Sequence, residues 1–235
     1  MEEHAIIPPK TKVVDSGIPD HLFQVPFRLV LYGASNSGKS VVLNNLLGSD
    51  RFPYKKIFKK NIFIFSETIQ LLDPSWQDVK LPDDRIINGY QEDVIKQIWD
   101  EQVKIIKQHG KEKAPHILFL FDDTITTISL SRQSLLNRLF FQGRHSKIST
   151  CITSQHYTSV PKGVRLNADN AIIFDVNTKQ ATAMGDEQTI ESNEFAIILR
   201  YATEEAYSFL VVMYKHPIKT RYQLRFTGKY FEVEK

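Results

Sequence analysis

The hydrophobic residues of this chain fall into short runs separated by longer amphipathic segments. Residues 39–47 and 90–109 repeat apolar positions at helical spacing, and residues 135–140 indicate a third helix. The short runs are rich in β-branched and aromatic residues and apolar on both faces, which is typical of buried parallel strands. They cover residues 27–32, 62–65, 117–121, 148–153 and 171–176. This alternation predicts a parallel sheet with right-handed crossovers.

The two ends of the chain depart from this pattern. Residues 1–26 contain four prolines and no sustained periodicity, so they predict an extended lead-in. Residues 195–201, 206–214 and 220–233 predict strands with short polar breaks between them. We therefore expect a single domain over residues 27–235, in which about 195–233 form an antiparallel extension of the sheet.

Composition narrows the class of protein. Hydrophobic residues make up 42% and charged residues 24%, which rules out wholesale disorder. A net charge of +3 is too weak to hold a polyanion by bulk attraction, so nucleic-acid binding would need a local cluster or repeated subunits. The one cysteine, Cys151, excludes an internal disulfide framework. With no signal sequence and no apolar run near the ~18 residues of a membrane span, a soluble intracellular protein is expected.

The sequence GASNSGKS at residues 33–40 matches the P-loop pattern, with a predicted strand before it and a predicted helix after it. In such a loop, consecutive backbone N–H groups and the helix N-terminus face phosphate oxygens. We expect Lys39 to reach the β- and γ-phosphates of ATP and the Ser40 hydroxyl to bind Mg²⁺. The expected nucleotide-binding residues are Gly33, Ala34, Ser35, Asn36, Ser37, Gly38, Lys39, Ser40 and Val41.

A second motif, ILFLFDD, ends in two adjacent carboxylates. Like charges at close range repel and raise each other's pKa, and a bound metal ion with a polarised water would offset the repulsion between these two carboxylates. We assign Asp122 to the Mg²⁺ shell and Asp123 to orienting or deprotonating the attacking water, with Glu67 as a fallback base. Together with the intervening strand and helix, this predicts an α/β P-loop NTPase of the RecA-like (ASCE) type, with a mostly parallel central sheet flanked by helices.

A third signal follows the strand predicted at 148–153. Polar residues at the carboxyl end of such a strand lie in the crevice where α/β sheets bind ligands. Gln155 is the candidate that would sense the γ-phosphate or hold the catalytic water, and Thr153 and Ser154 compete with it.

These motifs, in this order, resemble the FtsK/HerA superfamily of DNA-translocating ATPases. The resemblance is strongest to the small viral genome-packaging ATPases of the poxvirus and giant-virus lineage, including those of virophages. Asp123 departs from the glutamate of the cellular pumps, which puts the position of the water in doubt. The resemblance spans about residues 24–200 and rests on residues 33–40, 117–123, 142–145, 153–155, 160–167 and 169–174.

The resemblance implies a homo-oligomeric ring, a pentamer or hexamer, that uses ATP and Mg²⁺ to pump double-stranded DNA into a capsid. A capsid vertex protein is then a partner, and the host cytoplasm, a viral factory or the virion is the expected location. Gln155 takes the sensor position. An arginine supplied to a neighbouring subunit would fall on Arg144, with Arg165 as the second candidate.

Two groups of basic residues are candidates for DNA contacts. The first group, Lys55, Lys56, Lys59 and Lys60, is interleaved with Phe52, Tyr54 and Phe58. This mixture suits phosphate contacts with base stacking, but equally a solvated segment whose aromatic residues pack inward. The second group is Lys162 and Arg165, after the sensor strand. Since no base-reading motif is evident, sequence-independent gripping of the backbone is expected.

Three other functions stay open at this point. A replication helicase or a chromosome-segregation pump would use the same motifs. A P-loop nucleotide kinase would need an arginine-bearing lid, which residues 123–148 do not suggest. A nucleotide-binding assembly factor that hydrolyses little is disfavoured by the intact Lys39, Ser40, Asp122 and Asp123.

Overall fold

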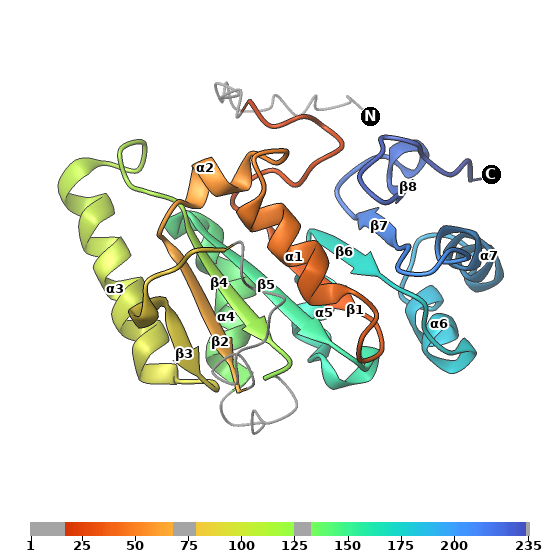
Figure 1. Cartoon of the computed structure of the whole chain (residues 1–235), viewed down its shortest axis with the longest axis horizontal. Helices are drawn as coiled ribbons and strands as arrows, with labels where there is room; N and C mark the ends of the chain where they lie inside the picture. The colour runs from red at the N-terminus through yellow and green to blue at the C-terminus, as the bar shows by residue number, and fades with distance from the viewer. Residues whose placement is uncertain (1–16, 68–78, 125–132, 234–235) are drawn as a thin grey trace, which may run out of the picture.

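The structure is a computed structural model that describes residues 17–67, 79–124 and 133–233. These residues form an eight-stranded sheet with helices on both faces (Figure 1). The sheet is mostly parallel and continues into antiparallel C-terminal strands, so the predicted α/β class is confirmed. None of the helices within these residues is long and apolar enough to cross a membrane.

All of the strands predicted from the apolar runs are present, and every residue in them is buried. They are β1 (Arg28–Tyr32), β2 (Ile62–Ser66), β4 (Ile117–Asp122), β5 (Ile148–Ser154) and β6 (Asn170–Ile173). A further parallel strand, β3 (Ile86–Asn88), pairs with β2. Its three residues are too few to produce a recognisable pattern in the sequence.

The strand order is β3-β2-β4-β5-β1-β6-β7-β8, and the strands from β3 to β6 are parallel. One strand, β5, therefore lies between the two motif strands β1 and β4. The parallel strands end together at one end of the sheet, which we call the carboxyl end, and begin together at the amino end. In register, Tyr32 at the end of β1 pairs with Ser154 at the end of β5.

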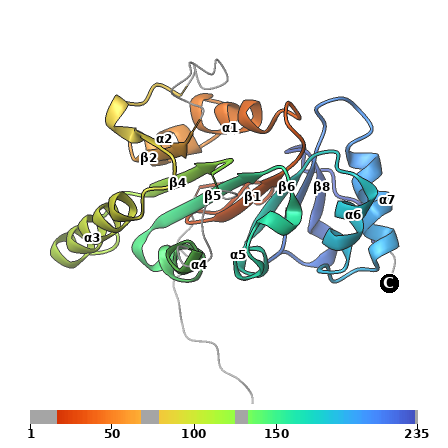
Figure 2. The ribbon, with the colours of Figure 1, turned by 90° about the horizontal axis from the view of Figure 1, so that it is seen from below.

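Two hydrophobic layers cover the faces of the sheet. Figure 2 shows the helices that lie on each face. On one face lie α1 (Lys39–Gly48) and α2 (Tyr54–Phe58); on the other lie α3 (Glu92–His109), α4 (Gln133–Gln142) and α5 (Lys162–Asn167). Gly110 ends α3 with a φ of 84°, as the sequence predicts. Short 3₁₀ helices complete this part of the chain: η3 (Asp83–Arg85), η6 (Gly143–Ser146) and η7 (Tyr157–Ser159).

The C-terminal region contains α6 (Thr178–Gly185), α7 (Ser192–Ala202), β7 (Leu210–Met213), η8 (Ile218–Thr220) and β8 (Tyr222–Leu224). The antiparallel extension is confirmed, because β7 runs antiparallel to β6 and β8 runs antiparallel to β7. The strand predicted at 195–201 is wrong, because these residues belong to α7. Phe195, Ile198 and Leu199 are buried at helical spacing, and this periodicity outweighs the β-branched composition of the run.

Part of the predicted lead-in is packed against the domain. Ile18, Leu22 and Phe23 are buried in the same layer as α1 and α2. The backbone N–H of Phe23 donates to the Tyr54 hydroxyl at 2.7 Å, and this hydroxyl donates to the Phe23 carbonyl at 3.0 Å. Residues 17–26 are thus fixed to α2 by both polar and apolar contacts.

Candidate active site

The loop between β1 and α1, residues 33–38, has the backbone geometry of a phosphate cradle. The N–H of Gly33 donates to the carbonyl of Ser154 at 3.2 Å, which fixes the start of the loop against the end of β5. A Cβ at Gly33 would lie 2.6 Å from Ser37 Oγ, which leaves no room for a side chain. Gly38 caps α1 with a φ of 101°, a conformation that L residues rarely adopt. Both motif glycines are therefore required by the path of the backbone.

Lys39 lies buried at the start of α1 with its ammonium turned back over the loop. Its Nζ donates to the carbonyls of Gly33 and Ala34, both at 2.8 Å. Burial lowers the pKa of Lys39, while the nearby carboxylates of Asp123 and Asp122 act in the opposite direction. The ammonium thus lies between the loop and the two acids of the second motif.

The two acids stand at the end of β4 and are joined through Thr153 on β5. The Thr153 hydroxyl donates to Asp122 Oδ1 at 2.7 Å and accepts the backbone N–H of Asp123 at 2.9 Å. Asp122 is buried, whereas Asp123 is exposed and has a φ of 51°, which turns the chain out of the strand. Thr153 is completely buried, and its two hydrogen bonds fix the turn that separates the two carboxylates.

Gln155 extends from the end of β5 toward the same turn. Its Nε2 donates to Asp123 Oδ2 at 2.7 Å. Ser154, the other competing candidate, is buried, and its hydroxyl donates to the carbonyl of His156 at 2.9 Å. Of the three polar residues considered for the sensor position, Gln155 is the one whose side chain bonds the carboxylate of Asp123.

A cavity of about 760 Å³ joins these groups at the carboxyl end of the sheet. Its lining comes from the P-loop, the start of α1, both acids, Gln155 and Tyr207. Glu67, the fallback base, follows β2 at the same end of the sheet but does not line this cavity. The predicted residues of the P-loop, β4 and β5 thus come together, although they are far apart in the sequence.

Tyr207 is a lining residue that the sequence did not single out. It is 73% exposed, has a φ of 61° and belongs to the turn between α7 and β7. A Cβ built on Gly38 would lie 3.5 Å from Tyr207 Cδ1, so the ring stands beside the start of α1. Arg225 holds this turn, because its guanidinium bonds Ser208 Oγ at 3.0 Å and the Glu205 carboxylate at 2.5 Å. No motif could have revealed this contact, because it depends on the antiparallel extension.

The cavity fits a nucleoside triphosphate with a magnesium ion. Ser37 Oγ is buried and has no hydrogen-bond partner within the described residues, as expected of a group that faces a phosphate. Within those residues there is no cluster of three or more histidine, cysteine or acidic side chains. Magnesium needs no such cluster, since it usually takes one or two protein ligands together with substrate phosphates and water. Ser40 and Asp122 are the residues here that could hold it.

The two candidate trans-acting arginines lie in different surroundings. Arg144 is exposed on η6 at the amino end of the sheet, at the opposite end from the cavity at the P-loop. Arg165 on α5 is half-buried and already engaged. It pairs with Glu187 at 2.6 Å, donates to the Val160 carbonyl at 2.7 Å and stacks over the Tyr157 ring at 4.5 Å. These contacts favour a structural role for Arg165.

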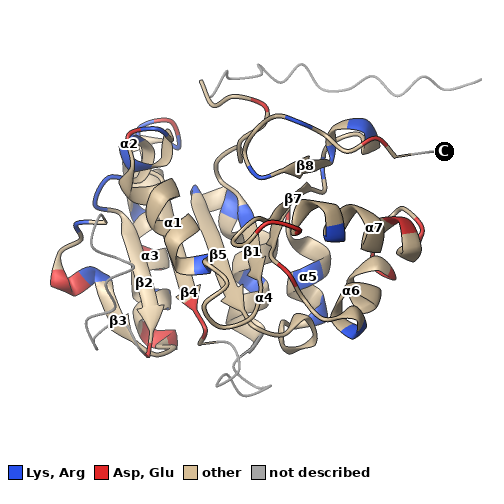
Figure 3. Ribbon diagram, turned by 45° about the vertical axis from the view of Figure 1, so that its right-hand side comes forward, with Lys and Arg blue, Asp and Glu red and all other residues tan. Residues whose placement is uncertain are grey.

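The first group of candidate DNA-binding lysines lies on α2 and directly after it, at the amino end of the sheet (Figure 3). Lys55, Lys56, Lys59 and Lys60 are exposed. The neighbouring Tyr54 and Phe58 are only 1% and 0% exposed, so they pack inward and are not available for base stacking. Of the second group, Lys162 at the start of α5 is exposed, whereas Arg165 is half-buried.

The fold and the site define a P-loop NTPase with a strand inserted between its two motif strands. Comparisons with known proteins agree with this class. The family model described as Poxvirus A32 protein matches residues 18–216. The chain belongs to this family, so the resemblance to viral genome-packaging ATPases of the FtsK/HerA type is confirmed.

Two viral relatives and one solved structure illustrate the similarity. The chain is 28% identical to the DNA packaging protein OPG160 of variola virus over 70% of its own length and 59% of that protein. It is 26% identical to the uncharacterized protein 075L of invertebrate iridescent virus 6, over 86% and 67% of the two chains. The structure of the genome packaging NTPase B204 from Sulfolobus turreted icosahedral virus 2, in complex with ATP-gammaS, matches with a TM-score of 0.55 at 17% identity, covering 82% of this chain and 94% of that one.

Proposed function

We propose that this chain is a Mg²⁺-dependent ATPase that drives double-stranded DNA into a viral capsid as one subunit of an oligomeric ring. The observation that carries the proposal is the gathering of Lys39, Asp122, Asp123 and Gln155 around one cavity at the P-loop. The family and the packaging protein of variola virus support the choice of DNA packaging as the process served. A viral factory or the virion is then the place of action.

In this proposal, the backbone N–H groups of residues 33–41 bind the phosphates of ATP. Lys39 exchanges its two loop carbonyls for β- and γ-phosphate oxygens, which its position over the loop favours. Ser40 and Asp122 hold Mg²⁺, which offsets the negative charge of the phosphates when bound. The hydrogen bond from Thr153 keeps Asp122 in place for this role.

Asp123 is the residue that we assign to the attacking water. Its carboxylate lies in the cavity and accepts a hydrogen bond from Gln155, so both side chains could contact a single water. Because aspartate is shorter than glutamate, Gln155 would share with Asp123 the task of holding this water. Glu67 loses support as the base, since it does not line the cavity.

Tyr207 is proposed to stack on the base of the nucleotide. The residue is exposed, its ring stands beside the start of α1, and its turn is held by Arg225. Stacking of a base on an aromatic side chain contributes about 1–3 kcal/mol and tolerates different bases. The contact would therefore strengthen nucleotide binding without taking part in hydrolysis.

Assembly into a ring would place an arginine of one subunit at the nucleotide of the next. Arg144 is the better candidate, because it is exposed while Arg165 is bound to Glu187. Mixing Arg144→Ala subunits with Lys39→Ala subunits tests this role. At some interfaces, an intact Lys39 of one subunit would then meet an intact Arg144 of its neighbour. Absence of activity at every mixing ratio, with both variants assembling, would remove the support for Arg144.

The deciding experiment measures ATP hydrolysis with and without linear double-stranded DNA, together with the mass of the particles. We expect DNA to stimulate turnover by an assembled ring and Lys39→Ala to abolish it. Turnover by Lys39→Ala at the wild-type rate would show that the P-loop assignment is wrong. Phosphoryl transfer to a nucleoside monophosphate, unaffected by DNA, would instead identify a kinase. Nucleotide binding without turnover would identify an assembly factor, and DNA unwinding by the ring would favour a helicase.

A further inference from the structure

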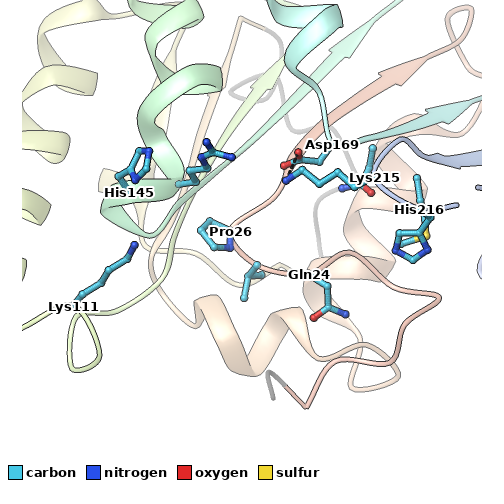
Figure 4. Close-up of a pocket in the computed structure, with 11 residues that line it drawn as sticks. Gln24, Pro26, Lys111, His145, Asp169, Lys215 and His216 are labelled. Carbon is cyan, nitrogen blue, oxygen red and sulfur yellow. Dashed lines mark ion pairs between the residues drawn. The ribbon is translucent and has the colours of Figure 1, made fainter. Parts of the chain in front are cut away.

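A second cavity, of about 500 Å³, lies at the amino end of the sheet, opposite the nucleotide cavity (Figure 4). We call it the amino-end groove. One wall is formed by Lys111 after α3 and by Arg144 and His145 on η6, and the other by Lys215 and His216 after β7. The floor includes residues 24–26 and Asp169.

The topology of the sheet explains why positive charges gather there. Residues that precede parallel strands all lie at the amino end, and Lys111 and Arg144 are of this kind. Because β7 is antiparallel, the residues that follow it return to the same end. Lys215 consequently meets Asp169, which precedes β6, with Nζ 2.6 Å from Oδ1.

The groove has more cations than its own acid can neutralise. Within the described lining, three basic side chains face one carboxylate, that of Asp169, which gives 3 − 1 = +2 with the histidines neutral. This carboxylate is already bound by Lys215 and by the buried Arg28, whose Nε donates to Oδ2 at 2.9 Å. No carboxylate among these residues is left to neutralise Lys111 and Arg144.

Positive charge continues behind and beside the groove. Burial and the charge of Lys111 lower the pKa of Lys147, although the carboxylate of Glu112 acts in the opposite direction. Burial, Lys147 and Lys111 lower the pKa of His116 to about 4. Lys59 and Lys60, which precede β2, are exposed at the same end of the sheet. The basic surface is thus wider than a single phosphate group requires.

We propose that the amino-end groove binds the phosphodiester backbone of a nucleic acid, gripped between the Lys111 wall and the Lys215 wall. A phosphodiester carries acceptors and no donors, which complements a groove whose free side chains are mainly donors. An acidic peptide would bring backbone N–H donors, and the one carboxylate of the lining is already engaged. The inference rests on the proposed function for its DNA partner, but it selects the amino end over α5 as the surface that holds the DNA.

The test compares the double variant Lys111→Ala/Lys215→Ala with a matched double variant, Lys104→Ala/Lys179→Ala, whose lysines are exposed elsewhere on α3 and on α6. Arg144 is left intact, because it is also the candidate trans-acting arginine. Binding of a fluorescent 30-base-pair duplex is measured by anisotropy over a range of salt concentrations. Loss of two phosphate contacts should weaken binding roughly 10- to 60-fold at about 0.1 M salt and reduce the slope of log K against log salt by about 1.8. The matched variant should bind as the wild type does.

Binding of a fluorescent ATP analogue should stay unchanged in the groove variant, because the nucleotide cavity lies at the other end of the sheet. Lys111→Glu, a change on an exposed loop that leaves the Asp169 contacts intact, provides a second test if the double variant does not fold. The groove proposal is overturned if the duplex binds both variants equally well. It is also overturned if polyglutamate, but not DNA, loses affinity in the groove variant, since the site would then take an acidic peptide. A wild-type protein that hydrolyses ATP but binds no DNA would instead overturn the DNA partner of the proposed function, and the groove proposal with it.

Discussion

The Thr153 hydroxyl is expected to position the two acids for ATP hydrolysis. It joins the two acids, by donating to Asp122 at 2.7 Å and accepting the N–H of Asp123 at 2.9 Å. Thr153→Val removes both hydrogen bonds and keeps the shape of the side chain. A hydrogen bond to a charged group contributes about 1.5–3 kcal/mol. If these hydrogen bonds hold the two acids as the transition state requires, their loss should lower the turnover rate roughly 10- to 150-fold.

The assay is steady-state ATP hydrolysis, with nucleotide affinity and unfolding free energy measured in parallel. Thr153→Ser keeps the hydroxyl and should retain most of the wild-type turnover. Thr150→Val is a matched control, because Thr150 is buried on the same strand and its hydroxyl has no hydrogen-bond partner within the described residues. This variant should lose neither stability nor activity. Wild-type turnover by Thr153→Val, or an equal loss in Thr150→Val, would refute the positioning role of the Thr153 hydroxyl.

Three further predictions follow from the same geometry. Asp123→Asn should bind ATP normally but hydrolyse it at least about 100-fold more slowly, since general-base catalysis typically contributes at least that factor; similar rates would move the role elsewhere. Tyr207→Ala should raise KM for ATP about 5- to 150-fold with little change in kcat, whereas Tyr207→Phe should preserve both, as stacking on the base requires. His116, whose pKa burial and two lysines lower to about 4, should lose its stabilising effect as the pH falls from about 6.5, because the unfolded state then binds the proton more readily. His116→Gln should therefore flatten the dependence of unfolding free energy on pH between about 6.5 and 4, and an unchanged slope would contradict this assignment.

The strands and the motif residues at their ends could be predicted because each is encoded locally. A run that is buried on both faces leaves an apolar signature, and the loop after β1 carries the glycines that its backbone needs. Parallel pairing then brings the ends of β1, β4 and β5 together, so the grouping of Lys39, Asp122 and Gln155 follows from the class of fold. These are the parts of the site in which local pattern and tertiary structure agree.

The remaining features depend on contacts between distant segments. The run at 195–201 is β-branched and aromatic enough for a strand, but burial of Phe195 and Leu199 on one side makes it a helix. The aromatic residues among the α2 lysines are ambiguous in the sequence; in the structure Tyr54 and Phe58 are core residues, and Phe52 is partly buried against the same layer. Arg165 could not be separated from Arg144 by pattern, because its pairing with Glu187 joins α5 to the end of α6.

The antiparallel strand β7 explains why neither the Tyr207 contact nor the place of Lys215 in the amino-end groove could be predicted from the sequence. Parallel strands place their following loops at the carboxyl end, so motifs that follow such strands mark that end of the sheet. A strand of reversed direction contributes to both ends: Tyr207 precedes β7 beside the nucleotide cavity, and Lys215 follows β7 in the groove. All four residues of β7 are buried, and this strand links the turn at Tyr207 to the loop at Lys215 through the sheet. Because β7 pairs with β6, which itself pairs with the P-loop strand β1, the groove and the nucleotide cavity are built on one continuous hydrogen-bonded framework.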